Sequence, residues 1–459
     1  MIPSRFTVRV PIPARQEVFL LHTLTDAQAV VSEDVDARLF DGDCSRPAPW
    51  DAHTAHLEEA TRTLAELGFL VRAREQDDRE LDRYFGAIRN DTSELRVTVL
   101  TTLRCNFGCD YCLQGDHESG AAHMSPEEAA RVCTWIEAQL DAVRPRHLAI
   151  TFFGGEPLLN LPALEIVARG AHAAATSRGV TTTLDIITNG LLLTPAVVDR
   201  LLPLGLRGVK ITLDGDRDRH DRQRPLRGGQ GTFDRIVENL RAIAGRCAIA
   251  IGGNVDADAL EDCTRLLDRL AAEPFAASIS KVSFKPIVKR APAGSPRVIP
   301  LVPAERARPD AAASSSPCDT CAFADEAFST LRGETTRRGF VTPDGVHMGP
   351  CELHHRHAHA IGPDGTRYLC PGFAGSPAHA IGHVARPATA AERQMSLRRD
   401  SLAAWRACGD CAFVPVCAGG CSLAAHHERH DMDAPDCHRS AFEAAAIDFA
   451  HTVLSQEPS

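Results

Sequence analysis

Six short apolar runs alternate with helix-like segments between residues 95 and 286. They read LRVTVLTT, HLAITFF, TTTLDIIT, RGVKITLD, CAIAIGG and KVSFKP. Continuous apolar runs are typical of strands buried on both faces, and a helical connection between successive runs makes neighbouring strands parallel. We therefore expect an α/β fold in which six parallel strands form a barrel or partial barrel. In such a barrel the active site lies in the loops at the carboxyl ends of the strands.

Three cysteines lie in the loop that follows the first run. In CNFGCDYC, Cys105, Cys109 and Cys112 are separated by three and then two residues. Structural zinc sites usually take four protein ligands, and catalytic ones take three and a water. Three cysteines at this spacing suit a [4Fe–4S] cube that is held at three corners. The spacing therefore favours an iron–sulfur cluster with one iron open to a small molecule.

This arrangement resembles the radical S-adenosylmethionine (SAM) enzymes, whose C-x3-C-x2-C loop follows the first strand of a partial (βα)6 barrel. Further motifs of that family follow in order: FFGGEPLLN at 152–160, TNG at 188–190, LDG at 213–215 and GGNV at 252–255. The resemblance implies that the [4Fe–4S] cluster binds SAM and cleaves it with one electron to a 5′-deoxyadenosyl radical, which abstracts hydrogen from an unactivated carbon. The residues that it implies for SAM binding are Tyr111, Gly154, Gly155, Glu156, Pro157, Thr188, Asn189 and Asn254.

Two polar positions have a plainer alternative. Tyr111 would pack near the adenine of SAM in the family geometry, or else serve as a core aromatic. Asp214, in the LDG that ends a strand, is the candidate catalytic residue, and His220 or Arg224 is a further candidate to touch SAM or substrate. The alternative for Asp214 is a turn in which Asp and Gly merely suit the backbone.

Seven further cysteines follow the pattern C-x13-G-x4-C, then C-x2-C-x5-C-x3-C, then C. This pattern resembles the SPASM extension of radical SAM maturases, and it implies two auxiliary iron–sulfur clusters. The resemblance assigns one cluster to Cys408, Cys411, Cys417 and Cys437, and the other to Cys351, Cys370 and Cys421. For the fourth ligand of the second cluster, the alternatives are an open iron, one of His354, His355, His357 and His359, or Cys318 or Cys321.

Each of these cysteine and histidine segments also has another interpretation. The histidines are typical of a solvated loop, and CDTC at 318–321 suits a small metal site of its own or reduced surface thiols. The C-x2-C-x5-C-x3-C segment alone could hold zinc as a ribbon, but with a reducible cluster upstream we favour electron relay. The unpaired cysteines Cys44, Cys133, Cys247 and Cys263 are expected to be small buried apolar side chains.

The chain divides into four expected units. These are an N-terminal α/β module (1–92), a radical SAM core (93–289), a linker or insertion (290–345) and a SPASM iron–sulfur domain (346–459). Peptide maturases often begin with a winged-helix-like module that pairs a leader peptide with a sheet edge. We expect RFTVRVP to supply that edge, with Arg5 and Arg9 attracting an acidic leader. The alternative is a cap that only covers the barrel.

Composition limits the partners of the chain. The net charge of −10 leaves no broad basic face, so we do not expect nucleic acid as a partner. The first residues do not read as a secretory signal, and no apolar run approaches the length of a membrane span. We therefore expect a cytoplasmic protein without a membrane partner. Its 16 cysteines then indicate metal or redox chemistry rather than disulfides.

These observations predict a radical SAM oxidoreductase that crosslinks or oxidises a residue of a ribosomally made peptide. The resemblance to peptide maturases covers about residues 60–440 and implies a leader-bearing peptide or protein substrate and an electron donor such as flavodoxin or ferredoxin. A competing enzyme is an anaerobic sulfatase-maturating activity, which forms formylglycine. A competitor of another class is a non-catalytic iron–sulfur electron carrier or peptide-binding scaffold. The GGEP segment argues against the last, because an electron carrier needs no pocket for the SAM amine.

Overall fold

The computed structural model describes residues 1–41, 52–112, 122–256, 258–287, 319–347 and 349–456. Its main element is a curved sheet in the order β11-β10-β9-β8-β7-β6-β12-β13-β14. The first six of these strands are parallel and follow the chain order: β6 (Glu94–Leu100), β7 (His147–Phe153), β8 (Thr181–Thr188), β9 (Leu206–Thr212), β10 (Ala248–Val255) and β11 (Ile279–Pro286). The predicted α/β partial barrel of six parallel strands is confirmed.

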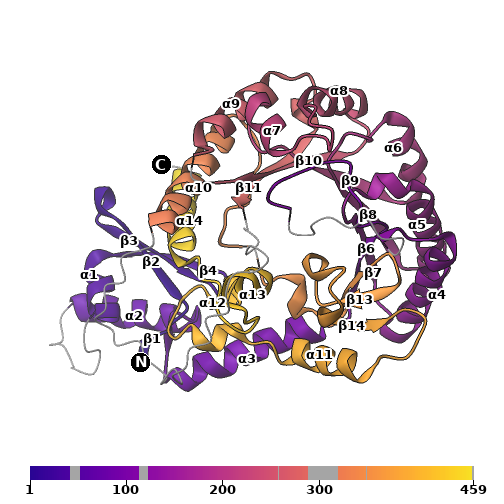
Figure 1. Ribbon diagram of the computed structural model, residues 1–459. Coiled ribbons are helices and arrows are strands. Elements are labelled where there is room, and N and C mark those ends of the chain that lie inside the picture. Colours follow the sequence, from indigo (N-terminus) through magenta and orange to yellow (C-terminus); the bar gives the residue numbers. More distant parts are fainter. Residues whose placement is uncertain (42–51, 113–121, 257, 288–318, 348, 457–459) are drawn as a thin grey trace, which may run out of the picture.

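Helices cover the convex face of this sheet (Figure 1). They are α4 (Pro126–Val143), α5 (Leu161–Thr176), α6 (Pro195–Leu201), α7 (Arg217–Gln223), α8 (Phe233–Ile243) and α9 (Leu260–Ala272). Alternate strand residues, such as Val97, Ile150 and Ile186, point toward these helices and form the main core with them. The residues between them face the inside of the barrel, because successive side chains of a strand point to opposite faces. The sheet thus leaves its polar inward positions for a site.

The C-terminal region extends the sheet at the edge of β6 and fills part of the ring seen in Figure 1. Its strands are β12 (Ala358–Ile361), which runs parallel to β6, and the antiparallel β13 (Thr366–Tyr368) and β14 (Ala380–His383). Its helices are α10 (Asp319–Arg337), α11 (Ala390–Ser401), α12 (Val414–Cys417), α13 (Ser422–Arg429) and α14 (Arg439–Gln456). None of the described helices combines the length and apolar character that a membrane crossing requires.

The N-terminal region forms a small α/β unit of its own. Its sheet has the order β2-β3-β4, from β2 (Thr7–Ile12), β3 (Glu17–His22) and β4 (Ala27–Ser32), and β1 (Ile2–Pro3) pairs with β5 (Leu70–Val71). The accompanying helices are α1 (Glu33–Asp36), α2 (Ala52–Glu66) and α3 (Arg74–Asn90). One face of β3 packs under α1 and α2 through Val18 and Leu20. The unit therefore has an apolar interior that does not depend on the barrel.

The other faces of this unit are shared with the C-terminal region. Val8 and Val10 of β2 lie in one apolar cluster with Ala446 and Ala450 of α14. On α3, Phe85 stacks on Trp405 with ring centroids 4.0 Å apart. Burying this apolar surface stabilises the contact between the two ends of the chain. The first 90 residues are thus a part of the C-terminal packing and not a separate appendage.

Candidate active site and cysteine clusters

The cysteine loop lies at the carboxyl end of β6, where the sequence predicts it. Burial raises the pKa of the Cys109 thiol to about 11, Arg224 acts in the opposite sense, and Cys105 and Cys112 add to the rise. This mutual effect places the three sulfurs within electrostatic reach of one another. A buried thiol does not ionise readily by itself, so a thiolate here requires a nearby cation such as a metal. Three neighbouring thiols in a half-buried loop suit such a metal centre.

The loop after α7 holds the cysteine loop from the other side. The Gly108 N–H donates to the Pro225 carbonyl at 2.9 Å, and the Arg227 N–H donates to the Asn106 carbonyl at 3.0 Å. Arg227 Nε also donates to the Cys105 carbonyl at 2.8 Å. Two segments more than 100 residues apart in the chain are thereby joined by backbone bonds. Sequence reasoning missed Asn106 and Arg227, because nothing in their local pattern indicates this long-range pairing.

The GGEP segment lies against the same cysteine loop. A Cβ atom on Gly155 would come within 2.2 Å of the Arg104 carbonyl oxygen, so only glycine allows this approach. The Gly155 N–H donates to the Thr102 carbonyl at 3.0 Å, and the Glu156 N–H donates to the Arg104 carbonyl at 2.9 Å. The loop after β7 therefore runs parallel to the start of the cysteine loop, and Pro157 opens the short turn that follows.

The Glu156 carboxylate is fully buried and connects three segments. Its Oε1 accepts from the Leu158 N–H at 3.0 Å and from Thr188 Oγ1 at 2.8 Å. Its Oε2 accepts from the Asn189 N–H at 2.8 Å. Burial raises the pKa of Glu156, and these hydrogen bonds oppose the rise. Asn189 in turn donates from Nδ2 to Asn106 Oδ1 at 2.7 Å. Glu156 is thus a positioning residue that ties the TNG segment to the cysteine loop.

Four polar side chains meet beside the cysteines: Tyr111, Asp214, Arg224 and Asn254. Asp214 is fully buried, accepts from the Tyr111 hydroxyl, and also accepts from the Asn254 N–H at 2.8 Å. Asn254 Nδ2 donates to the Tyr111 hydroxyl at 3.0 Å, and Arg224 donates to the same oxygen. Burial alone would lower the pKa of Arg224, but Tyr111 and Asp214 outweigh burial and raise it, so the guanidinium stays charged.

This network joins the cysteine loop to the ends of β9 and β10. Tyr111 comes from the loop, Asp214 follows β9 and Asn254 belongs to β10. His220 lies behind Asp214, since the Asp214 N–H donates to His220 Nδ1 at 3.4 Å and His220 Nε2 bonds Thr232 Oγ1 at 3.1 Å. Burial lowers the pKa of His220 well below its usual value, so this ring is neutral. His220 supports Asp214 and does not face the site.

We expect Asp214→Asn to lower SAM cleavage about 10- to 100-fold, because the amide keeps the shape of the carboxylate but removes the charge that orients Tyr111 and Arg224. Steady-state formation of 5′-deoxyadenosine and SAM affinity by equilibrium dialysis measure the effect. Asp218→Ala is the control, since Asp218 is exposed on α7. Unchanged affinity and turnover in Asp214→Asn would leave Asp214 as a residue that only shapes the turn.

The C-terminal cysteines gather in two sets. In the first, burial raises the pKa of Cys370 to about 12, and Cys421 and Cys351 add to the rise. In the second, burial raises the pKa of Cys417 to about 12, and further contributions come from Cys408, Cys411 and Cys437. The members of each set are those that the SPASM resemblance groups together. Their role as cluster ligands stays a prediction.

No group of three or more His, Cys, Asp or Glu side chains in the described ranges is arranged around a single metal position. A [4Fe–4S] cube does not require such convergence, because each of its cysteines binds a different iron. Of the other candidates for a fourth ligand, Cys318 lies outside the described residues, and the structure does not describe the side chain of Cys321. Cys44 also lies outside the described residues, Cys263 is buried as expected, and Cys133 and Cys247 are partly exposed.

The histidines after Cys351 are less exposed than a solvated loop would be. His354 is buried, and its ring contacts those of Phe85 and Trp405, with centroids 6.2 Å and 5.4 Å away. His359 lies on β12 and packs edge-on against Trp135 of α4 at 4.9 Å. The expectation of a solvated loop is wrong for these two, because η7 (Glu352–His354) and β12 carry them into apolar packing. The sequence motif contains no signal for this burial.

Burial lowers the pKa of His354 to about 4, and nearby Arg89 acts in the same sense. The folded protein therefore keeps this ring neutral while the unfolded chain binds a proton below about pH 6.5. The contribution of neutral His354 to the free energy of unfolding is fully present above pH 6.5 and is lost as the pH falls toward 4. We expect the free energy of unfolding to drop by about 2 kcal/mol more in the wild type than in His354→Phe between pH 7 and pH 5. Denaturant unfolding at both pH values measures this difference.

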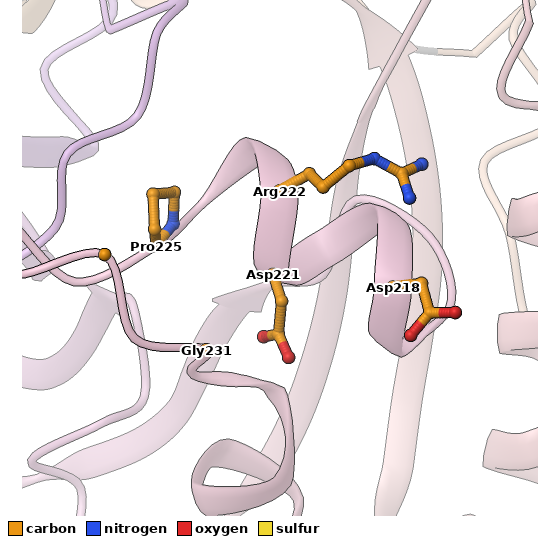
Figure 2. A pocket seen from close by; sticks show the side chains of 6 residues that line it. Asp218, Asp221, Arg222, Pro225 and Gly231 are labelled. Carbon is orange, nitrogen blue, oxygen red and sulfur yellow. The ribbon is translucent and has the colours of Figure 1, made fainter.

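A surface pocket of about 550 Å³ lies beside the candidate site. It is lined by Asp218, Asp221, Arg222, Pro225, Gly229 and Gly231. In Figure 2, the Asp221 side chain points from α7 toward the loop that carries Gly231, while Asp218 lies at the other end of the helix and points away from that loop. Asp221 Oδ1 accepts from the Thr232 and Phe233 N–H groups and so begins α8. None of the six residues belongs to the expected SAM site, so this pocket is separate from it.

The fold and site define a partial (βα)6 barrel with a three-cysteine loop at the carboxyl end of its first strand. Residues 99–251 match the family model described as the radical SAM superfamily, so this segment is a radical SAM domain. Members of this superfamily are enzymes, and the domain implies a [4Fe–4S] cluster and SAM. The match covers the cysteine loop, the GGEP and TNG segments and the LDG.

Curated relatives match about a third of this chain or less. GTP 3′,8-cyclase of Microcystis aeruginosa is 34% identical over 154 residues, which are 33% of this chain and 39% of that protein. PqqA peptide cyclase of Granulibacter bethesdensis is 30% identical over 131 residues, which are 28% of this chain and 32% of that protein. The radical SAM cyclopropyl synthase TigE of Paramaledivibacter caminithermalis is 27% identical over 139 residues, 28% of each protein. The aligned region thus spans about two fifths or less of these relatives.

Solved structures resemble more of the chain. Native anSMEcpe with bound AdoMet and the Kp18Cys peptide has a TM-score of 0.59 at 14% identity, covering 79% of this chain and 99% of that one. SuiB of Streptococcus suis bound to precursor peptide SuiA has a TM-score of 0.50 at 12% identity, covering 95% and 99%. At these identities the likeness is one of fold. It extends beyond the barrel into the cysteine-rich C-terminal region.

Proposed function

We propose that this protein is a radical SAM peptide maturase. The observation that carries the proposal is the joining of the cysteine loop to the GGEP and TNG segments by Glu156 and Asn189. A loop that only held a structural metal would not need segments from two further strands to lie against it. Here the polar ends of β7, β8, β9 and β10 converge on one place, as a site for a cofactor with several polar groups requires.

The donor set fits a [4Fe–4S] cluster. Cys105, Cys109 and Cys112 supply three thiolates, and no fourth cysteine is adjacent in the sequence. Such a cluster with SAM supplies a 5′-deoxyadenosyl radical able to take hydrogen from an unactivated carbon. The protein's residues orient that chemistry. Glu156 fixes the loop that would bind the methionine amine of SAM. Tyr111, Asp214 and Asn254 form a polar edge of the site that would lie around the nucleoside of SAM. Arg224 neutralises the Asp214 carboxylate at this edge.

The two C-terminal cysteine sets would hold auxiliary clusters in this proposal. They would pass electrons between a reductant such as flavodoxin or ferredoxin and the site, which suits an oxidative modification. The relative named as a peptide cyclase and the neighbours solved with peptides support a peptide substrate. A sulfatase-maturating reaction is the second candidate, and the fold likeness to anSMEcpe favours it as an alternative.

The test is to reconstitute the protein anaerobically and supply dithionite and SAM. Formation of 5′-deoxyadenosine supports a radical SAM activity, and its absence with intact clusters contradicts it. Three substrate classes are then compared by mass spectrometry: a random peptide library, a sulfatase-type Cys or Ser peptide, and GTP. A crosslinked or oxidised library peptide supports the maturase. Formation of formylglycine in the Cys or Ser peptide would replace the proposed function by a sulfatase-maturating activity. Turnover of GTP would replace it by a GTP-modifying activity.

The N-terminal unit would bind the leader of such a peptide, although not through Arg5 and Arg9. Arg5 pairs with Asp78, and Arg9 pairs with Asp36 and Asp41. The expectation that these two cations attract an acidic leader is wrong, because carboxylates of the same unit already neutralise them. β2 and β4 are both edges of this sheet, since each pairs only with β3, but β2 packs against α14 through Val8 and Val10. β4 is the better edge, because it alternates partly buried and exposed residues along its length. We propose that an extended leader adds to this edge.

We expect Val30→Glu to weaken binding of a leader-bearing peptide about tenfold, because Val30 is 37% exposed on β4 and a carboxylate would disfavour an apolar leader contact. Fluorescence anisotropy measures the affinity. Leu397→Glu is the matched control, since Leu397 is 70% exposed on α11. Equal affinity of Val30→Glu and Leu397→Glu for the leader-bearing peptide would favour the alternative that the N-terminal unit only covers the barrel. Deleting residues 1–90 is a poorer test, because it exposes the apolar faces of α14 and Trp405.

A further inference from the structure

Lysine is rare in this chain, and the described lysines lie on two strands of the barrel. Of the 50 lysine and arginine residues, four are lysines: Lys210, Lys281, Lys285 and Lys289. Lys210 belongs to β9, and Lys281 and Lys285 belong to β11, while Lys289 lies outside the described residues. Everywhere else the chain uses arginine as its cation. The compact ammonium group is therefore placed on two strands that flank β10.

These lysines point into the barrel. Val209 and Ile211 pack into the core with the outer helices, so Lys210 between them faces the opposite side. In the register, Ala250 of β10 lies between Lys210 and Lys281, and Asn254 lies beside Lys285. Asn254 is the residue that bonds Tyr111 and Asp214, so Lys285 lies at the level of the candidate SAM site.

The chain makes room for Lys210 on the inward face of β10. A Cβ atom on Gly252 would lie 2.9 Å from Lys210 Cε, so the lysine stem passes over this glycine toward the carboxyl end of the barrel. Burial lowers the pKa of Lys210, and Lys285 and then Lys281 add to the lowering. The ammonium groups of Lys281 and Lys285 are thus close enough to Lys210 to disfavour its charge, and all three lie on one side of the sheet.

No described carboxylate forms an ion pair with any of the three. The nearest acidic residue of the network, Asp214, is already shared by Tyr111, Asn254 and Arg224. Lys210 is partly buried, and Lys281 and Lys285 are exposed. The buried cations near the site do have carboxylate partners: Arg224 has Asp214, and Arg219 of α7 has Asp256 and Asp262. Three accessible lysines that face the inside of the barrel without a carboxylate partner give this side of the site a positive potential, which attracts an anionic group of a ligand.

We infer that Lys210, Lys281 and Lys285 bind a side-chain carboxylate of the peptide substrate and so select an acidic residue near the one that is modified. This inference rests on the proposed peptide maturase function. An ammonium group is a compact point charge, whereas the planar guanidinium needs a wider space. Small residues of β10, Ala250 and Gly252, leave that compact space between the two lysine-bearing strands. Lys285 then holds the substrate beside the SAM site.

The small number of lysines makes a direct test practical. Reductive methylation with ¹³C-formaldehyde labels four side chains and the N-terminus, and single Lys→Arg variants assign the NMR signals. The probes are the peptide acetyl-Gly-Gly-Glu-Gly-Gly-amide and its Gln counterpart, added to the cluster-loaded, SAM-bound protein. We expect the Glu peptide to shift the signals of Lys210, Lys281 and Lys285. The Gln peptide should shift none of them.

Several results would overturn the inference. These are equal shifts with both peptides, no shift with either, or saturation of the lysine signals by SAM alone or by GTP alone. As a second measurement, Lys285→Met should raise the Kd of the Glu peptide about tenfold, and should leave the Kd of the Gln peptide unchanged. Formation of 5′-deoxyadenosine without peptide is recorded on the same samples. If the wild type forms no 5′-deoxyadenosine, the proposed function is contradicted. If the Glu and Gln peptides shift the lysine signals equally, only this inference is contradicted.

Discussion

Replacing Cys105, Cys109 and Cys112 together by alanine is expected to abolish SAM cleavage. We expect the reconstituted wild type to hold about three clusters, and the triple variant to lose about four iron atoms per chain while it keeps those of the C-terminal sets. The three thiols lie in one loop and act on one another, whereas the other two sets lie in separate parts of the fold. Iron analysis, electron paramagnetic resonance of the reduced protein and 5′-deoxyadenosine formation measure the effect.

Two controls accompany this variant. Cys247→Ala removes a partly buried thiol that belongs to none of the three sets, and it should change neither iron content nor activity. Cys417→Ala should lower the iron of the C-terminal region and leave SAM cleavage detectable. Zinc in place of iron in every site of the wild type would contradict the assignment, and so would full SAM cleavage in the triple variant.

Glu156→Ala is expected to destabilise the protein by about 3–5 kcal/mol, because it leaves three buried donors without an acceptor. Those donors are the Leu158 and Asn189 N–H groups and the Thr188 hydroxyl. The same change frees the TNG segment from the cysteine loop, so we expect SAM affinity to fall by at least about 100-fold in the protein that remains folded. Denaturant unfolding and equilibrium dialysis with SAM measure the two effects.

Glu137→Ala is the matched control, since Glu137 is exposed on the outer helix α4. Its effect should stay within about 0.5 kcal/mol. A Glu156→Ala protein of wild-type stability and SAM affinity would show that Glu156 does not hold the loop. Lowered stability with unchanged SAM affinity would make Glu156 a purely structural residue, and the cofactor would then need another anchor.

The regular part of the fold could be predicted from local patterns. Each of the six apolar runs forms a strand, and their order in the sheet is their order in the chain. This works because a buried strand needs continuous apolar residues, and a parallel neighbour needs a helical crossover. The cysteine loop, GGEP, TNG and LDG could be placed for the same reason, since each directly follows a strand and therefore lies at one edge of the sheet.

Contacts between distant segments could not be predicted in this way. Nothing near Arg227 indicates that it donates to the Cys105 carbonyl 122 residues away. The cations of Arg5 and Arg9 look free in the sequence, yet Asp78, Asp36 and Asp41 neutralise them after folding. His354 lies in a run of histidines that looks solvated, and only its packing against Phe85 and Trp405 buries it.

The sequence by itself determined the kind of barrel, the loop that carries the first three cysteines and the class of cofactor that such a loop suits. Spacing along the chain is enough to predict these three features, because the residues of one loop or one strand are close in space however the rest of the chain folds. Only the tertiary structure decided which charges remain without a partner. Lys210 and Lys285 are 75 positions apart, and their common environment exists only because β9, β10 and β11 are adjacent and Gly252 lies between them.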